Sequence, residues 1–243
     1  MESNAVYDRY LSIFSPEGRL YQIEYAFNAV KSFGNLAVGI KGKDCVVVLS
    51  QKKVTDNTVD MSDVTNLYRI TDHIGCLMTG LPADCYAQVG KAREEATEFK
   101  FKYGYEIPIS VLAKKVADNC QIKTQRAEMR VFGCIMILAG IDDETGPAVY
   151  KIDPAGNCWS FKGTSGGNKA QEATNYLEKQ MEGNKEFSFE ETVELGLSTI
   201  QTVFGSDISS SDVEVGCVQN GKYWTVLTRD EIDTHLNHLT ERD

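Results

Sequence analysis

The stretch YDRYLSIFSPEGRLYQIEYA covers residues 7–26 and changes character near its middle. Polar and aromatic residues without a clear apolar period come first, and they predict a tail over residues 1–15. Ser15-Pro16-Glu17-Gly18 follows and predicts a turn, because proline fixes one backbone angle and glycine tolerates the left-handed region. The same Ser-Pro pair can also cap and open a helix.

An amphipathic helix is predicted over residues 19–32. Its apolar residues recur at steps of three and four, which places them in one stripe: Leu20, Ile23, Phe27 and Val30. Tyr25 lies off this stripe. We therefore expect a helix with one face that packs and another that meets solvent.

Downstream of this helix, short apolar runs alternate with longer amphipathic segments. The short runs predict strands at 36–40, 45–49, 64–70, 74–79, 134–141, 148–152, 158–161, 213–218 and 223–227. Helical periods predict helices at 82–103, 109–125, 168–181, 189–204 and 229–239. Paired helices between sets of hairpins favour two antiparallel sheets stacked face to face, with helices covering both outer faces. No linker interrupts the pattern, so residues 1–243 are predicted to form one domain whose sandwich covers 35–243.

Composition limits the possible functions. Hydrophobic residues are 42% of the 243, which is enough for a sizeable core, and the formal net charge is −10. An acidic chain is a poor candidate for nucleic-acid binding, because phosphate contacts need clustered Lys and Arg. No apolar run approaches a membrane span, and Met1–Asn4 lacks the charged and apolar regions of a secretory signal. We therefore expect no nucleic-acid and no membrane partner.

Cofactor and metal sites find little support in the sequence. The seven cysteines lie singly and form no CxxC pair, so they predict reduced, buried thiols. His235 and His238 are one helical turn apart and could share a metal, but no carboxylate or cysteine is clearly placed to complete the set, which favours a solvated face. Residues 163–167, GTSGG, could cradle a phosphate, yet they lack Walker spacing and favour a flexible turn before a helix. We predict no cofactor and no metal.

The stretch over residues 7–26 closely resembles the N-terminal signature of 20S proteasome alpha subunits, a YDR tail followed by FSPxGRLxQxEYA at the start of a helix. The resemblance covers the whole chain. Within the family, alpha type-6, at ring position alpha-1, is most similar at GKDC (42–45), KYGYE (102–106), AEMR (127–130) and DPAG (153–156). Val131-Phe132 and Asn157 depart from the residues usual in that type.

This resemblance implies a fold and a role. The fold is a four-layer αββα sandwich of the N-terminal-nucleophile hydrolase type. The role is that of a structural subunit in an outer ring that controls substrate entry for ubiquitin-dependent protein degradation. The residues that the resemblance assigns to the gate, where tails and helices contact each other across subunits, are Tyr7, Asp8, Arg9, Pro16 and Tyr25.

The resemblance also implies partners. These are other alpha subunits in a heteroheptameric ring, beta subunits, and regulatory particles, in the cytoplasm and nucleus. The predicted helix at 19–32 is expected to pack across contacts between subunits. In the family, a lysine in the strand before Gly80 pairs with the C-terminal carboxylate of an activator, and Gly80 lies close by. We assign that position to Arg69, which keeps the charge but differs from lysine in reach and geometry.

Catalytic beta subunits of this family share the fold. They use a threonine freed as a new N-terminus at the start of the first strand, with its own amine as base and a lysine and an aspartate nearby. Here the first strand begins near FGNL (33–36), without Thr or Ser at the nucleophile position. The aspartate position falls near Gln51 and the lysine position near Asn66, while Ser165-Gly166 resembles the pair that supports the threonine. These substitutions predict a non-catalytic subunit of a threonine-type endopeptidase complex.

Two other functions stay open at this point. One is an active N-terminal-nucleophile hydrolase of the beta type, and the other is an unrelated sandwich-fold binding protein. The missing catalytic groups and the intact N-terminal signature argue against the first. Incorporation into a particle far larger than 27.0 kDa would argue against the second.

Overall fold

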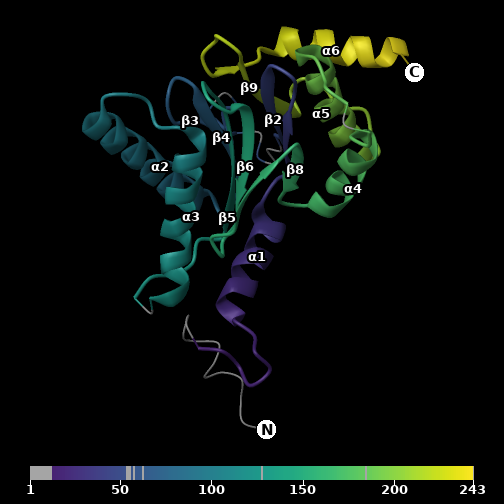
Figure 1. Ribbon diagram of the computed structural model, residues 1–243. Coiled ribbons are helices and arrows are strands. Elements are labelled where there is room, and N and C mark those ends of the chain that lie inside the picture. Colours follow the sequence, from purple (N-terminus) through teal and green to yellow (C-terminus); the bar gives the residue numbers. More distant parts are fainter. Residues whose placement is uncertain are drawn as a thin grey trace.

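Two stacked β-sheets form the centre of the molecule (Figure 1). The computed structural model describes residues 13–52, 56, 58–61, 63–126, 128–183 and 185–242. One five-stranded sheet has the order β10-β9-β2-β1-β8 and the other the order β3-β4-β5-β6-β7. Neighbouring strands pair antiparallel in both sheets, as the alternation of hairpins and helix pairs predicts.

The bounds of the elements agree with most of the sequence-based expectations. The strands are β1 (Ala37–Lys41), β2 (Cys45–Gln51), β3 (Leu67–Arg69), β4 (Ile74–Gly80), β5 (Cys134–Asp142), β6 (Gly146–Ile152), β7 (Cys158–Phe161), β8 (Gly163–Gly166), β9 (Val213–Gln219) and β10 (Thr225–Val226). The helices are α1 (Tyr21–Phe33), α2 (Pro82–Tyr103), α3 (Ile109–Gln125), α4 (Ala170–Gln180), α5 (Phe189–Phe204) and α6 (Arg229–Arg242).

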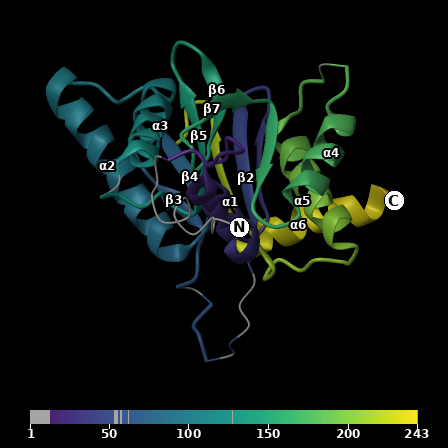
Figure 2. The same ribbon diagram turned by 90° about the horizontal axis from the view of Figure 1, so that it is seen from below.

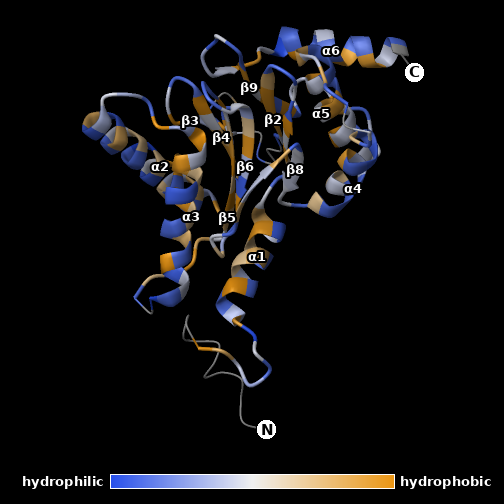
Figure 3. Cartoon of the chain, viewed as in Figure 1, coloured by the Kyte–Doolittle hydropathy of each residue, from blue (hydrophilic) through white to orange (hydrophobic). Residues whose placement is uncertain are grey.

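Helices cover both outer faces of the stacked sheets, which gives the predicted four-layer sandwich (Figure 1). Strand β4 shows why: its side chains alternate, so that Cys76 and Met78 face α2 and α3 while Leu77 faces the other sheet. Both faces of β4 are therefore apolar, and Figure 3 shows β2 and β4 largely in orange, while the helices around the sheets carry both orange and blue residues.

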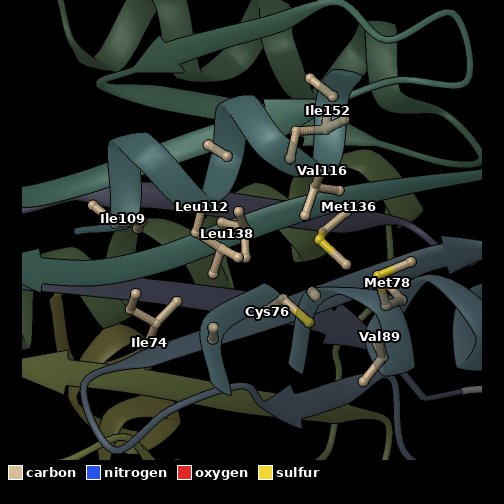
Figure 4. Packing of buried hydrophobic residues seen from close by; sticks show 14 of the residues in the cluster. Ile74, Cys76, Met78, Val89, Ile109, Leu112, Val116, Met136, Leu138 and Ile152 are labelled. Atoms are coloured by element: carbon tan, nitrogen blue, oxygen red, sulfur yellow. The ribbon is translucent and has the colours of Figure 1, made fainter. Parts of the chain in front are cut away.

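The layer between α2, α3 and the β3–β7 sheet is closely packed, as Figure 4 shows. Leu112 and Val116 of α3 lie against Met136 and Leu138 of β5, and Leu138 has no exposed surface. Complete burial of such a side chain contributes about 1.5–3 kcal/mol relative to an exposed position.

Helix α1 lies at one end of the sandwich, between the two helical layers (Figure 2). Val30 is buried in the apolar cluster between the sheets, and Ala26 packs on Val131. The helix begins at Tyr21, where no side chain caps it, so the prediction that Ser15-Pro16 opens the helix was wrong. Those residues form a separate turn instead, and Arg19 and Leu20, which belong to no helix or strand, separate this turn from the helix.

Residues 163–166 correct a second expectation. They form strand β8, which pairs with β1 over Ala37–Ile40, and not the flexible turn that the sequence favoured. Main-chain hydrogen bonds to β1 hold this segment in a strand. Its sequence gives no strand signal, because two of its four residues are glycine. The strands expected at 64–70 and 223–227 are also shorter than expected, at Leu67–Arg69 and Thr225–Val226.

The cysteines and the helices bear on two further expectations. Six of the seven thiols are buried and Cys158 is half-buried, so the expectation of buried thiols is confirmed for the six. Within the described ranges, no helix combines the length and the apolar character that crossing a bilayer requires.

We predict that Leu138→Ala lowers the free energy of unfolding by about 2–5 kcal/mol, because it leaves a cavity between α3 and the sheet. Val111→Ala on α3 is the control, since Val111 is 37% exposed and its truncation should cost less than about 0.5 kcal/mol. Chemical denaturation followed by tryptophan fluorescence measures both. Equal losses in the two variants would contradict the assignment of Leu138 to the core.

The junction between the first helix and the first strand

Several chain segments meet at the end of the sandwich where α1 becomes β1. Ala37 at the start of β1 pairs with Ser50 near the end of β2 and with Gly166 at the end of β8. Ser50 in turn pairs with Glu214 at the start of β9. The nucleophile, aspartate and lysine positions inferred from the sequence all fall here, so the structure brings them together.

The main chain runs through this junction without interruption at Gly34 and Asn35. The amide of Gly34 donates to the carbonyl of Val30 at 2.8 Å, and the Gly34 carbonyl accepts from the amide of Asn168 at 3.2 Å. The Thr79 hydroxyl donates to the Asn35 carbonyl at 2.6 Å. The amine that a threonine nucleophile would need is therefore part of a peptide bond in a fully anchored backbone.

Gly167 shows how closely the chain is packed at this point. Its φ is +84°, and a Cβ atom placed on it would lie 2.0 Å from the Asn35 carbonyl oxygen. Only glycine fits both the left-handed backbone and the close approach. The loop after β8 therefore presses directly on the residue at the nucleophile position.

The other catalytic positions are occupied by structural hydrogen bonds. The backbone amide of Gln51 donates to the Leu36 carbonyl at 3.0 Å, and the Asn66 amide side chain donates to the Ser50 hydroxyl at 3.3 Å. The hydroxyl of Ser165 donates to the Ala170 carbonyl at 2.6 Å, which ties β8 to α4. None of these groups carries the charge that a lysine or aspartate would supply.

Glu214 is a buried carboxylate that the sequence reasoning missed. Its side chain accepts from the Thr65 hydroxyl at 2.7 Å and from the Asn66 backbone amide at 2.7 Å, and the residue is 7% exposed. Burial raises the pKa of this carboxyl above the ordinary value for glutamate. It connects β9 of one sheet to the segment that enters β3 of the other. A single acidic residue within an apolar strand run was the only sequence signal for it.

The predicted gate residues are only partly within the described structure. Tyr7, Asp8 and Arg9 lie outside the described residues, and their assignment stays a prediction. Pro16 lies in the turn that precedes α1, where the Gly18 amide donates to the Ser15 carbonyl at 2.8 Å. The ring of Tyr25, 44% exposed, stacks on a second tyrosine of the same helix. The gate roles of Pro16 and Tyr25 also stay predictions.

The two residues assigned to an activator pocket do not lie together. Arg69 on β3 pairs with Gly75 at the beginning of β4, whereas Gly80 ends the same strand. Five residues of extended chain separate these positions by about 16 Å. Arg69 instead forms an exposed ion pair with Asp72, at 3.4 Å. The residue of the β3 approach that lies near Gly80 is Asn66, whose carbonyl accepts from the Met78 amide at 2.9 Å.

The two histidines of α6 have different surroundings. His238 Nδ1 lies 3.8 Å from Oε1 of Glu194, a buried carboxylate on α5. His235 is half-buried, with its ring edge against Phe189, so the expectation of a solvated face was wrong for His235. Burial lowers the pKa of His235. Among the described residues, no three His, Cys, Asp or Glu side chains are arranged to hold a metal ion.

Comparison with known proteins agrees with this geometry. A family profile described as "Proteasome subunit" matches residues 32–218, and a second profile, which describes the N-terminal signature of A-type proteasome subunits, matches residues 7–29. The chain is 45% identical over 238 residues to the probable alpha type-1 proteasome subunit of Schizosaccharomyces pombe, covering 98% of each chain. It is 44% identical over 243 residues to the alpha type-6 proteasome subunit of Caenorhabditis elegans, covering 99% of this chain and 98% of that one.

The fold and the junction define a protein of the N-terminal-nucleophile sandwich class that lacks the nucleophile. The chain belongs to the proteasome subunit family, and its N-terminal signature places it among the alpha-type subunits. It is thus a non-catalytic, outer-ring subunit, and the resemblance inferred from the sequence is confirmed. The two alternatives, a catalytic beta-type hydrolase and an unrelated binding protein, were wrong.

We predict that restoring the three catalytic groups does not restore chemistry. In the variant Asn35→Thr/Gln51→Asp/Asn66→Lys, the amine of residue 35 remains in a peptide bond, because α1 still precedes it. Hydrolysis of a fluorogenic peptide by the purified chain should stay at background, and mass spectrometry should find an uncleaved N-terminus. Cleavage before residue 35 that is accompanied by hydrolysis would refute this reasoning.

A second prediction concerns Glu214, whose pKa is raised by folding. Its protonated form is favoured in the fold, so its contribution to stability is complete below the ordinary glutamate pKa of about 4.3 and is lost as pH rises through the folded value. Glu214→Gln should therefore gain stability relative to the unmodified chain as pH rises from about 4.5 to 7.5. Glu98→Gln, at an exposed position, is the control. If the stability difference between Glu214→Gln and the unmodified chain did not change with pH, the prediction would be wrong.

Proposed function

We propose that this subunit forms part of the wall and of the entrance gate of the 20S core particle, a threonine-type endopeptidase complex. In this role it controls substrate access and carries out no peptide-bond cleavage itself. The observation that carries the proposal is the position of α1, which fills the end of the sandwich where a catalytic relative would expose its threonine. Residues 7–14, which precede the turn before that helix, belong to the matched signature.

The proposed partners are the other alpha subunits of a heteroheptameric ring, the beta subunits of the next ring and regulatory particles. The apolar stripe of α1 supports a contact with a neighbouring subunit. Val30 is buried within the chain, whereas Leu20, Ile23 and Phe27 are only partly buried and leave apolar surface for a partner. The proposed location of the particle is the cytoplasm and the nucleus, where ubiquitin-dependent degradation takes place.

Removing the leader tests the gate. Particles whose copy of this subunit lacks residues 2–14 should assemble normally, because the deletion leaves the turn at Ser15 and all of α1 in place. Their basal hydrolysis of a fluorogenic peptide should rise, since part of the closure over the pore is missing. A variant with residues 2–14 in scrambled order serves as the control for chain length.

The outcome separates two roles. A rise with the deletion and a smaller rise with the scrambled leader would support a plug that also depends on specific residues. Unchanged basal hydrolysis in correctly assembled deletion particles would rule out a gating role for this leader and leave only the wall.

A further inference from the structure

A cavity of about 430 Å³ lies at the end of the sandwich opposite α1. Four connections line it: the β3–β4 turn, the α2–α3 loop, the β5–β6 turn and the β9–β10 turn. Strand β4 separates it from the α1–β1 junction, because Ile74 at its start lines the cavity while Gly80 at its end lies beside Gly34. Its seven residues span about 20 Å, and Figure 1 shows α1 at the far end of the sheets.

The buried part of the cavity lining is apolar. Ile74, Ile107 and Ile109 line the cavity and are each at most 3% exposed. Pro108, between the last two, adds a half-buried apolar ring at the start of α3. An apolar group that entered the cavity would gain about 25 cal/mol for each Å² of apolar surface removed from water. The cavity volume falls within the range of about 300–1,000 Å³ that is usual for ligand sites.

The β5–β6 turn places three consecutive carboxylates at the cavity: Asp142, Asp143 and Glu144. Asp142 Oδ1 accepts from the backbone amide of Glu144 at 2.9 Å, which stabilises the turn, and Asp143 and Glu144 are exposed. Within the described part of the chain, none of the three forms an ion pair. Their negative charge therefore attracts a cation from outside the chain.

An aromatic ring at the cavity favours the same kind of ligand. Tyr105 of the α2–α3 loop lines the cavity, and its ring packs edge-on against Phe99, with centroids 5.2 Å apart. This contact restricts the ring to one position, where it can interact with a cation through its π electrons. Glu106 beside it is already paired with Lys100, so it does not add to the uncompensated charge.

The β9–β10 turn, which belongs to the other sheet, contributes hydrogen-bond donors. The backbone amide of Asn220 donates to the Asp44 carbonyl at 2.9 Å, which holds the turn and leaves the Asn220 side chain exposed. Lys222 Nζ donates to Gln219 Oε1, and an ammonium group has three donors, so further donors are available to a ligand. A peptide offers both a cationic side chain and carbonyl acceptors, whereas a free aliphatic amine offers no acceptor. The lining therefore favours a peptide.

We propose that this cavity binds a short peptide segment of a partner protein in which an apolar side chain is followed by lysine or arginine. The apolar side chain packs on the three isoleucines, the cation lies at Asp143 and Glu144, and Asn220 and Lys222 donate to the peptide carbonyls. The inference goes beyond the proposed gating function and does not depend on it, because the cavity and α1 lie at opposite ends of the sandwich.

Isothermal titration calorimetry of the purified full-length chain tests the site. The probe is an acetylated, amidated tripeptide of sequence LRK, compared with GRK, which lacks the apolar side chain, with LEE, which reverses the charge, and with agmatine, a free guanidine. The variant Asp143→Asn/Glu144→Gln removes the two exposed carboxylates. The matched control is Glu178→Gln/Glu182→Gln, which removes two exposed carboxylates at the end of α4. Melting temperatures establish that both variants are folded.

We expect LRK to bind, and GRK to bind at least about tenfold more weakly, because it buries no large side chain. LEE should show no binding. Asp143→Asn/Glu144→Gln should weaken binding of LRK about twofold to thirtyfold, the effect of losing two exposed ion pairs, while the α4 control leaves it unchanged. Raising the salt concentration from about 0.05 to 0.5 M should weaken binding to the unmodified chain, because salt screens exposed charges.

A second measurement uses the assembled particle. LRK with a photoreactive diazirine in its leucine side chain should crosslink to this subunit at residues 105–109 or 141–144, and an excess of unlabelled LRK should suppress the product. Mass spectrometry of the digested particle locates the crosslink.

Three results would overturn the inference. The first is the absence of LRK binding up to about 10 mM. The second is equal binding of LRK by Asp143→Asn/Glu144→Gln and by the α4 control, or crosslinks of this subunit only outside the two segments. The third is binding of agmatine as tight as that of LRK, which would identify a site for a free cation and not for a peptide.

Discussion

The hydroxyl of Thr79 donates to the carbonyl of Asn35, and this contact anchors the point where α1 becomes β1. Gly167 presses on the same carbonyl from the other side, and Val30 fills the space between the sheets one helical turn earlier. Burial of Val30 contributes about 1.5–3 kcal/mol and holds the C-terminal part of the helix against the core. Because the chain must pass through this junction, the end of the sandwich is closed to any chemistry that needs a free α-amine.

The same positions of the fold therefore have different roles in catalytic members of the class and in this chain. In a catalytic member of this class, the start of β1, the end of β2 and the approach to β3 would carry the threonine nucleophile, an aspartate and a lysine. Here Asn35, Gln51 and Asn66 use backbone and amide groups to join strands, and the buried carboxylate of Glu214 completes the network. The positions that carry a reactive site in catalytic members thus form a rigid, hydrogen-bonded junction in this chain.

The assignment of Arg69 shows where sequence reasoning stops. In the sequence, Arg69 directly precedes the turn of the hairpin that ends in Gly80, and we expected the two residues to lie close in space. Antiparallel pairing places them apart. Arg69, nearest the turn, pairs with Gly75 at the start of β4, whereas the earlier residue Asn66 lies near the end of β4. A shift of three residues in one strand thus decides which side chain could reach a ligand beside Gly80.

The sequence by itself determined the family, the four layers, the long helices α2, α3 and α5, and the loss of the catalytic residues. These follow from local periodicity and from residue identity at a highly specific signature. Only the tertiary structure decided that residues 163–166 are a strand, that Glu214 is a buried hydrogen-bond acceptor between the sheets, and that Arg19 pairs with Glu24 of α1. The reason is physical: backbone pairing with β1, burial between two sheets and a bidentate contact across Leu20 depend on groups that come together only when the chain has folded.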